Sequence, residues 1–202
     1  MKKMKQSKSN EFTKLLNPHL ESAMRFCRGL CYRLSNEDAE DVLQNALVKA
    51  FRFFHQISDQ DKFKPWLFTI ITNSYKSYLR NRFNPFSFRI EDEENPSFPS
   101  VYQQDSELSE SIRQALNSLR YKERTAILLY EVAGFSIDEI RMIQHEASAS
   151  AVKSRLSRAR RKLREFMRNE PVTRPSGRLT GSHKMKGDID NETIKLVEDL
   201  QI

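Results

Sequence analysis

Residues 136–168, SIDEIRMIQHEASASAVKSRLSRARRKLREFMR, contain the pattern that decides the fold of this chain. They predict two helices joined by a short turn. Ser136 and Glu139 have the spacing of a capping box, in which each side chain bonds the backbone N–H of the other residue, so a helix should begin there. Three isoleucines at helical spacing give this short helix one buried stripe: Ile137, Ile140 and Ile143.

The second predicted helix of this stretch is long and basic. Ser148 or Ser150 is suited to cap its N-terminus. Its apolar residues recur every three or four positions and form one face: Val152, Leu156, Ala159, Leu163 and Phe166. At about 100° per residue, the opposite face carries Ser154, Ser157, Arg158 and Arg161, and it is flanked by Lys153 and Arg164.

A helix with an apolar back and a front of serine, lysine and arginine fits the major groove of DNA. Lysine and arginine reach guanine acceptors there, and further cations neutralise phosphates. A solvated basic face, or one that binds an acidic protein or RNA, is the alternative. We favour DNA because the short capped helix lies directly upstream, which completes a helix-turn-helix.

The composition agrees with a polyanionic partner. The 202 residues carry 34 Lys and Arg against 27 Asp and Glu, a formal net charge of +7. Glycine is scarce, with 5 residues, and the apolar spacing is helical almost throughout. We therefore expect an all-α protein of two small helical domains joined by a flexible linker. No apolar run reaches membrane-spanning length and no signal peptide follows the basic start, so we expect no membrane insertion and a cytoplasmic location.

Composition shifts predict the domain boundaries. A first helical domain is expected at 10–83 and a second, with the helix-turn-helix, at 107–169. Between them, residues 84–106 contain three prolines and the acidic run EDEE, which predicts a linker. Residues 170–202 contain prolines and glycines and predict a flexible tail.

Three long helices are expected in the first domain. One should start at Asn17-Pro18 and run to about Leu34, after a frayed basic stretch at 1–9 and a short turn at 12–16. The second, at about 36–56, has a core face: Ala39, Val42, Ala46, Ala50 and Phe54. Its outer face holds Asp41, Gln44, Asn45 and Lys49.

The third helix, opened by Pro65, carries a polar stripe: Thr69, Asn73, Lys76, Ser77 and Arg80. Aromatic side chains beside amides and cations suit unstacked bases, which offer a π face and a hydrogen-bonding edge. The alternative is that Trp66, Phe68 and Tyr75 are core.

The chain shows no arrangement of residues that predicts an enzyme, a cofactor or a metal site. Its four histidines are scattered, and there is no glycine-rich phosphate loop. Cys27 and Cys31 could form a thiol switch or half a metal site. We favour a core role, because one apolar helix face holds Leu20, Met24, Cys27, Cys31 and Leu34.

Three ordered motifs resemble the bacterial sigma factors of the extracytoplasmic-function group, a branch of the sigma-70 family. Residues 39–51, AEDVLQNALVKAF, are similar to the polymerase-binding helix of region 2. Residues 66–80, WLFTIITNSYKSYLR, are similar to its promoter-melting helix. ALNSLRYKERTAILLYEVAGFSIDEI followed by VKSRLSRARRKLREF resembles region 4.

The resemblance implies a function in transcription initiation, with core RNA polymerase (the β′ clamp and β flap), promoter DNA and an anti-sigma factor as partners. It implies that the β′ clamp contacts are Asp41, Gln44 and Asn45. Residues 57–61, including Ile57, Ser58 and Asp59, would hold a flipped −10 base, and the −10 strand contacts would be Asn73, Lys76 and Arg80. The −35 element would be read by Lys153, Ser154, Ser157, Arg158 and Arg161. The acidic linker would enter the RNA channel.

Two features depart from the family pattern. The turn between Ile140 and Val152 is one residue longer than usual and lacks the turn glycine, and Arg141 stands where a small residue is common. A stand-alone helix-turn-helix regulator remains an alternative, but it would not need the motifs at 39–51 and 66–80. A sigma mimic that only sequesters an anti-sigma factor would have no reason to keep the basic helix.

Overall fold

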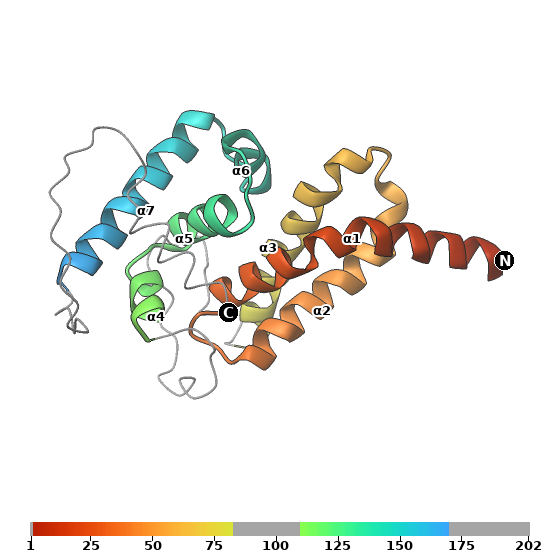
Figure 1. Cartoon of the computed structure of the whole chain (residues 1–202), viewed down its shortest axis with the longest axis horizontal. Coiled ribbons are helices and arrows are strands. Elements are labelled where there is room, and N and C mark those ends of the chain that lie inside the picture. Colours follow the sequence, from red (N-terminus) through yellow and green to blue (C-terminus); the bar gives the residue numbers. More distant parts are fainter. Residues whose placement is uncertain (1, 83–109, 170–202) are drawn as a thin grey trace, which may run out of the picture.

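The computed structural model describes residues 2–82 and 110–169, in which every regular element is helical (Figure 1). The first half contains α1 (Lys2–Leu30), α2 (Asn36–Phe53), the short 3-10 helices η1 (Phe54–Gln56) and η2 (Gln60–Lys62), and α3 (Phe63–Arg82). The second half contains α4 (Glu110–Asn117), α5 (Tyr121–Ile127), the π-helical turn η3 (Leu128–Val132), α6 (Ile137–Ile143) and α7 (Ala149–Asn169). The all-α prediction is confirmed. The predicted linker at 84–106 and tail at 170–202 lie outside the described residues.

The first helix was predicted wrongly at its start. Instead of beginning at Asn17-Pro18, α1 begins at Lys2 and continues through Pro18. A proline inside a helix removes a hydrogen bond and costs about 3 kcal/mol. Phe12 offsets this cost, because its ring is buried and makes edge contacts with three other rings: Phe51, Phe54 and Phe63, at centroid distances of 5.3, 5.3 and 5.8 Å.

The start of α2 is tied to the end of α3 through a buried carboxylate. Ser35 and Asp38 form a capping box at the N-terminus of α2. Asp38 also accepts hydrogen bonds from the Tyr78 hydroxyl and, at 2.7 Å, from Arg82. The predicted core face of α2 is confirmed, since all five of its side chains are buried: Ala39, Val42, Ala46, Ala50 and Phe54.

The local predictions for the helix-turn-helix are confirmed, except that Ile137 of the predicted isoleucine stripe is only partly buried. The Ser136 hydroxyl accepts from the Glu139 N–H at 3.3 Å, and the Glu139 carboxylate accepts from the Ser136 N–H at 2.8 Å. Of the two candidate caps for α7, Ser148 accepts from the Ala151 N–H at 3.2 Å. The fifth residue of the predicted apolar face, Phe166, is only partly buried. The other four are buried: Val152, Leu156, Ala159 and Leu163.

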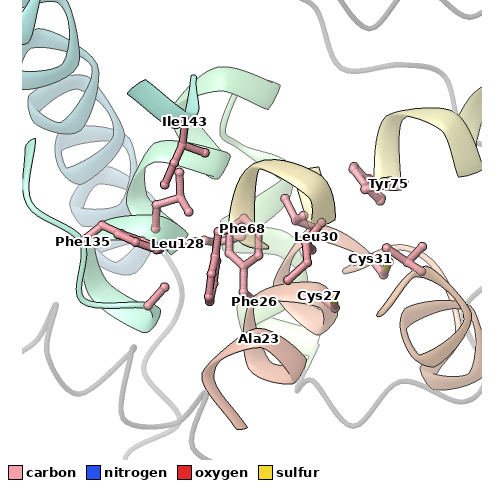
Figure 2. Close-up of a cluster of buried hydrophobic side chains, with 14 of the residues drawn as sticks. Ala23, Phe26, Cys27, Leu30, Cys31, Phe68, Tyr75, Leu128, Phe135 and Ile143 are labelled. Carbon is pink, nitrogen blue, oxygen red and sulfur yellow. The ribbon is translucent and has the colours of Figure 1, made fainter. Parts of the chain in front are cut away.

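The two halves pack on each other and share one continuous core, which the sequence did not predict (Figure 2). Phe68 of α3 meets Phe135, after η3, with ring centroids 4.9 Å apart. Gly29 of α1 lies so close to η3 that a Cβ there would be 2.6 Å from a methyl carbon of Leu128. The absence of a side chain at Gly29 therefore permits this close approach.

Both cysteines belong to the core. Cys27 and Cys31 are buried, and burial raises the pKa of each thiol above its ordinary value. The prediction of a core role is confirmed, although Leu20, assigned to the same face, is 40% exposed. Within residues 2–82 and 110–169, no cluster of metal-ligating side chains occurs. In those same ranges, no helix combines the length and the apolar character needed to cross a membrane.

Candidate nucleic-acid interface

The outer face of α7 is the broadest basic surface predicted to meet DNA. Its five candidate contacts are all exposed: Lys153, Ser154, Ser157, Arg158 and Arg161. Arg161 pairs only loosely, at 3.8 Å, with Glu165 on the same helix. The buried apolar back of α7 holds this face outward, so its cations are available to a polyanion.

A neighbouring cation of α7 has a structural role that the sequence analysis missed. Arg155 is 8% exposed and donates to the Gln144 side chain at 2.6 Å, while its guanidinium lies 2.9 Å from the Glu146 carboxylate. Gln144 in turn donates to the Lys122 carbonyl of α5 at 3.1 Å. These bonds fix α7 to the turn that precedes it.

Two further cations of α7 are held by acidic residues of the second half. Lys162 lies 2.7 Å from the Glu123 carboxylate of α5, and Arg160 lies 2.9 Å from Glu131 of η3. Arg158 is also 3.7 Å from Glu123, although its side chain is 54% exposed. Arg155, Arg160 and Lys162 therefore position α7. Arg158 is both a candidate DNA contact and a neighbour of the Glu123 carboxylate.

Glu123 is a nearly buried carboxylate whose charge is maintained by its neighbours. Burial by itself raises the pKa of Glu123, but hydrogen bonds from Lys162 and the Arg120 N–H oppose it. The positive charges of Lys162 and Arg158 act in the same direction. The net result is a pKa below the usual value, so Glu123 stays ionised and keeps its hold on α7.

The turn of the helix-turn-helix closes without a glycine. His145 takes a left-handed backbone conformation with φ of 54°. The His145 N–H bonds the Met142 carbonyl at 3.2 Å, and the Glu146 N–H bonds the Arg141 carbonyl at 2.9 Å. These two bonds form a Schellman motif, whose left-handed position glycine usually occupies. The missing glycine noted in the sequence is thus replaced by His145.

The polar stripe of α3 is partly open and partly covered. Asn73 and Arg80 are exposed, whereas Lys76 is half-buried with its ammonium 5.7 Å from the centre of the Tyr121 ring. Phe68 and Tyr75 are buried. For these two aromatic residues the core interpretation is confirmed, and they offer no stacking surface in this arrangement.

Residues 57–61, predicted to hold a flipped base, comprise the loop 57–59 between η1 and η2 and the first two residues of η2. Ile57 packs partly against the core, and Ser58 and Asp59 are exposed. The Asp59 side chain caps η2 by accepting from the Asp61 N–H at 3.1 Å, and it lies 3.3 Å from Lys62. The backbone of the loop is therefore held from both ends.

The outer face of α2 is exposed where the polymerase contacts were predicted. Asp41, Gln44 and Asn45 are all exposed, and Asn45 donates to the Asp41 carbonyl at 2.8 Å. The sequence analysis missed the apolar part of this surface, since Val48 is 64% exposed and Phe51 is 40% exposed. Their positions one and two turns after Gln44 could have revealed it.

Comparison with known proteins assigns the family. The family models described as Sigma-70 region 2 and Sigma-70, region 4 match residues 15–83 and 109–163. The ECF RNA polymerase sigma-E factor of Escherichia coli K12 is 34% identical over 135 residues, which cover 61% of this chain and 70% of that protein. The chain belongs to the extracytoplasmic-function sigma factors.

Other similarities agree with this assignment. The ECF sigma factor SigE of Mycolicibacterium smegmatis is 30% identical over 161 residues, which cover 76% of this chain but only 60% of that protein. The sigma factor RpoE in complex with the anti-sigma factor NepR, from Bartonella quintana, superposes with a TM-score of 0.63 and 28% identity, covering 79% of this chain and 98% of that one. CnrH, solved with the cytosolic domain of CnrY, has a TM-score of 0.57 at 24% identity over 82% of this chain and 94% of that one, and supports the fold alone.

This sigma factor is therefore an RNA polymerase subunit for promoter-specific transcription initiation. Region 2 includes most of α1 together with α2 and α3, and region 4 includes α4 to α6 and most of α7. The −10 and polymerase surfaces predicted from the sequence thus lie in region 2, and the predicted −35 surface lies in region 4.

Proposed function

We propose that this sigma factor recruits core RNA polymerase through α2 and reads the two promoter elements through α3 and α7. Its domains are assigned to residues 10–83 and 107–169, joined by the acidic linker and followed by the tail. The observation that carries the proposal is that each of these three helices buries its apolar face and presents polar side chains outward. It acts by binding rather than catalysis, in the cytoplasm.

On α2, we assign the contact with the β′ clamp to Asp41, Gln44 and Asn45. Val48 extends this surface, because an exposed apolar side chain beside polar ones is common at protein interfaces. Region 4 is assigned to the β flap.

In α3 and the loop before it, the −10 strand is assigned to these residues: Ile57, Ser58, Asp59, Asn73, Lys76 and Arg80. Asn73 and Arg80 are directly accessible. Lys76 lies against Tyr121 of region 4, so its contact with DNA requires region 4 to move away from α3.

On α7, the −35 element is assigned to Lys153, Ser154, Ser157, Arg158 and Arg161. Phosphate contacts supply salt-dependent affinity, and base-edge contacts add about 1–3 kcal/mol of discrimination each. Arg158 must exchange its contact with Glu123 for one with DNA.

We further propose that an anti-sigma factor binds this protein. RpoE of Bartonella quintana, which has the same fold, was solved in complex with the anti-sigma factor NepR. The close packing of regions 2 and 4 is a conformation that such a partner can stabilise by binding both regions.

The test is a pull-down with core RNA polymerase. Wild-type protein should be retained, and the double variant Asp41→Ala, Gln44→Ala should be lost. Glu21→Ala, which removes an exposed carboxylate of α1 instead, is the matched control and should bind normally. Wild-type protein that binds promoter DNA but not polymerase would indicate a stand-alone regulator instead.

A further inference from the structure

The N-terminal end of α1 extends beyond the rest of the molecule as a helical arm, residues 2–11 (Figure 1). Among the side chains described from Lys8 onward, the first buried one is Phe12. The arm also precedes residue 15, where the match to the region 2 family model begins. It is therefore a feature of this chain that the family match does not account for.

The composition of the arm is strongly basic. Four of its ten residues are lysines, Lys2, Lys3, Lys5 and Lys8, and Glu11 is its one acidic residue. An almost entirely polar arm gains little stability from burying apolar surface, and its like charges repel one another. A bound polyanion would reduce this repulsion.

The base of the arm is fixed beside the loop 57–61. Phe12 packs on Phe54, just before this loop, and on Phe63, just after it. Gln60 donates to the Glu11 carboxylate at 3.1 Å. The arm thus starts at a fixed point next to the loop assigned above to a flipped base.

We propose that this arm binds phosphates of the promoter strand that runs past the loop 57–61. This inference rests on the proposed function, which places a −10 base at that loop. From Lys2 to Lys8 the helix rises about 9 Å, close to the roughly 10 Å between the first and last of four phosphates at about 3.4 Å per phosphate of one strand. Four lysines along this length match that charge spacing.

The first test measures the salt dependence of promoter binding by reconstituted holoenzyme. The variant Lys2→Ala, Lys3→Ala, Lys5→Ala, Lys8→Ala keeps good helix formers but removes the charge. The slope of log K against log salt should become shallower by about 3, since each phosphate contact contributes roughly 0.7–0.9. The four Lys→Arg changes are the matched control and should leave the slope unchanged. An unchanged slope in the alanine variant, or loss of its binding to core polymerase, would overturn the proposal.

The second test locates the arm on DNA. An iron chelate attached to a Lys5→Cys variant cleaves nearby DNA, and the buried Cys27 and Cys31 should escape labelling. Cleavage is expected beside the −10 element, and cleavage confined to other positions would contradict the assignment. The variant Asn73→Ala separates the arm proposal from the assignment of the −10 strand to α3. If Asn73→Ala impairs promoter opening while the arm variant binds the promoter normally, only the arm proposal fails. Normal opening by Asn73→Ala would instead count against the α3 assignment.

Discussion

Helices α3 and α7 both combine an apolar face with a polar, basic stripe, but the structure uses the two stripes differently. On α7, Arg155, Arg160 and Lys162 are held by acidic residues of region 4 and position the helix. On α3, Asn73 and Arg80 remain exposed, while Phe68 and Tyr75, two of the aromatic residues that suggested base stacking, are buried. Counting cations therefore overestimates the DNA-facing charge of α7, and counting aromatic residues overestimates the stacking surface of α3.

The sharpest test of this comparison removes one paired, buried cation and one exposed cation from α7. Arg155→Ala should lower the free energy of unfolding by about 2–3 kcal/mol, because it removes the donor to the Gln144 side-chain oxygen and leaves Glu146 with only its 3.5 Å pair to Lys122. Arg161→Ala removes the same charge from the exposed face, where such pairs contribute about 0.5 kcal/mol. Urea denaturation of both variants measures the difference. Equal destabilisation would show that Arg155 is not a structural residue.

Lys153, which we propose contacts DNA, and Lys162, which pairs with Glu123, allow DNA binding and stability to be tested separately on one helix. Lys153→Ala should weaken −35 binding and reduce the salt slope by about 0.9, with little effect on folding. Lys162→Ala should cost about 1–2 kcal/mol of stability by removing a partner of Glu123, and should leave the slope nearly unchanged. Titration of promoter fragments at several salt concentrations, with denaturation in parallel, measures both effects. A loss of stability in Lys153→Ala together with a shallower salt slope in Lys162→Ala would show that Lys162 binds DNA and Lys153 stabilises the fold.

The Glu123 network predicts a specific dependence of stability on pH. The folded-state pKa of Glu123 lies below the ordinary value of a glutamate, so its contribution to stability is fully present above the unfolded-state pKa and is lost as the pH falls through the folded-state pKa. Glu123→Gln should show a shallower loss of stability on acidification than wild type. Glu165→Gln, which changes an exposed carboxylate of α7, should follow the wild-type curve. Identical curves for Glu123→Gln and wild type would exclude this source of pH dependence.

The smallest expected effect concerns the turn before α7. His145→Gly should raise the free energy of unfolding by about 0.5–1 kcal/mol, because glycine adopts a positive φ without the steric cost of a Cβ. The greater freedom of glycine in the unfolded chain reduces this gain. His145→Ala keeps the Cβ and should give no gain in thermal denaturation. A similar gain with alanine would implicate the imidazole rather than the backbone.

Much of region 4 could be predicted from the sequence because its signals are local. The Ser136–Glu139 capping box and the spacing from Val152 to Leu163 depend on residues within one or a few helical turns. The same applies to the outer face of α2 that we propose for polymerase binding, where the exposure of Asp41 and Gln44 follows from periodicity. The family resemblance rested on these same short motifs and is confirmed by the comparisons.

The start of α1 and the roles of individual cations could not be predicted in this way. Pro18 is a strong local signal for a helix start, but the packing of Phe12 on rings some forty to fifty residues later overrides it. Likewise, Arg160 and Arg161 are adjacent in sequence. Only the position of Glu131, in η3, makes the first structural and leaves the second exposed.

By itself, the sequence determined the family, most of the helices and the caps of α6 and α7, because these depend on periodicity and on contacts along one helix. The tertiary structure decided how regions 2 and 4 pack, since that depends on residues far apart in the chain. Tyr32 donates to Asn117 at 3.2 Å across 85 residues, and the guanidinium of the buried Arg124 lies 4.3 Å from the centre of the Tyr32 ring. No local pattern encodes such distances, and they determine which polar side chains remain available to DNA and polymerase.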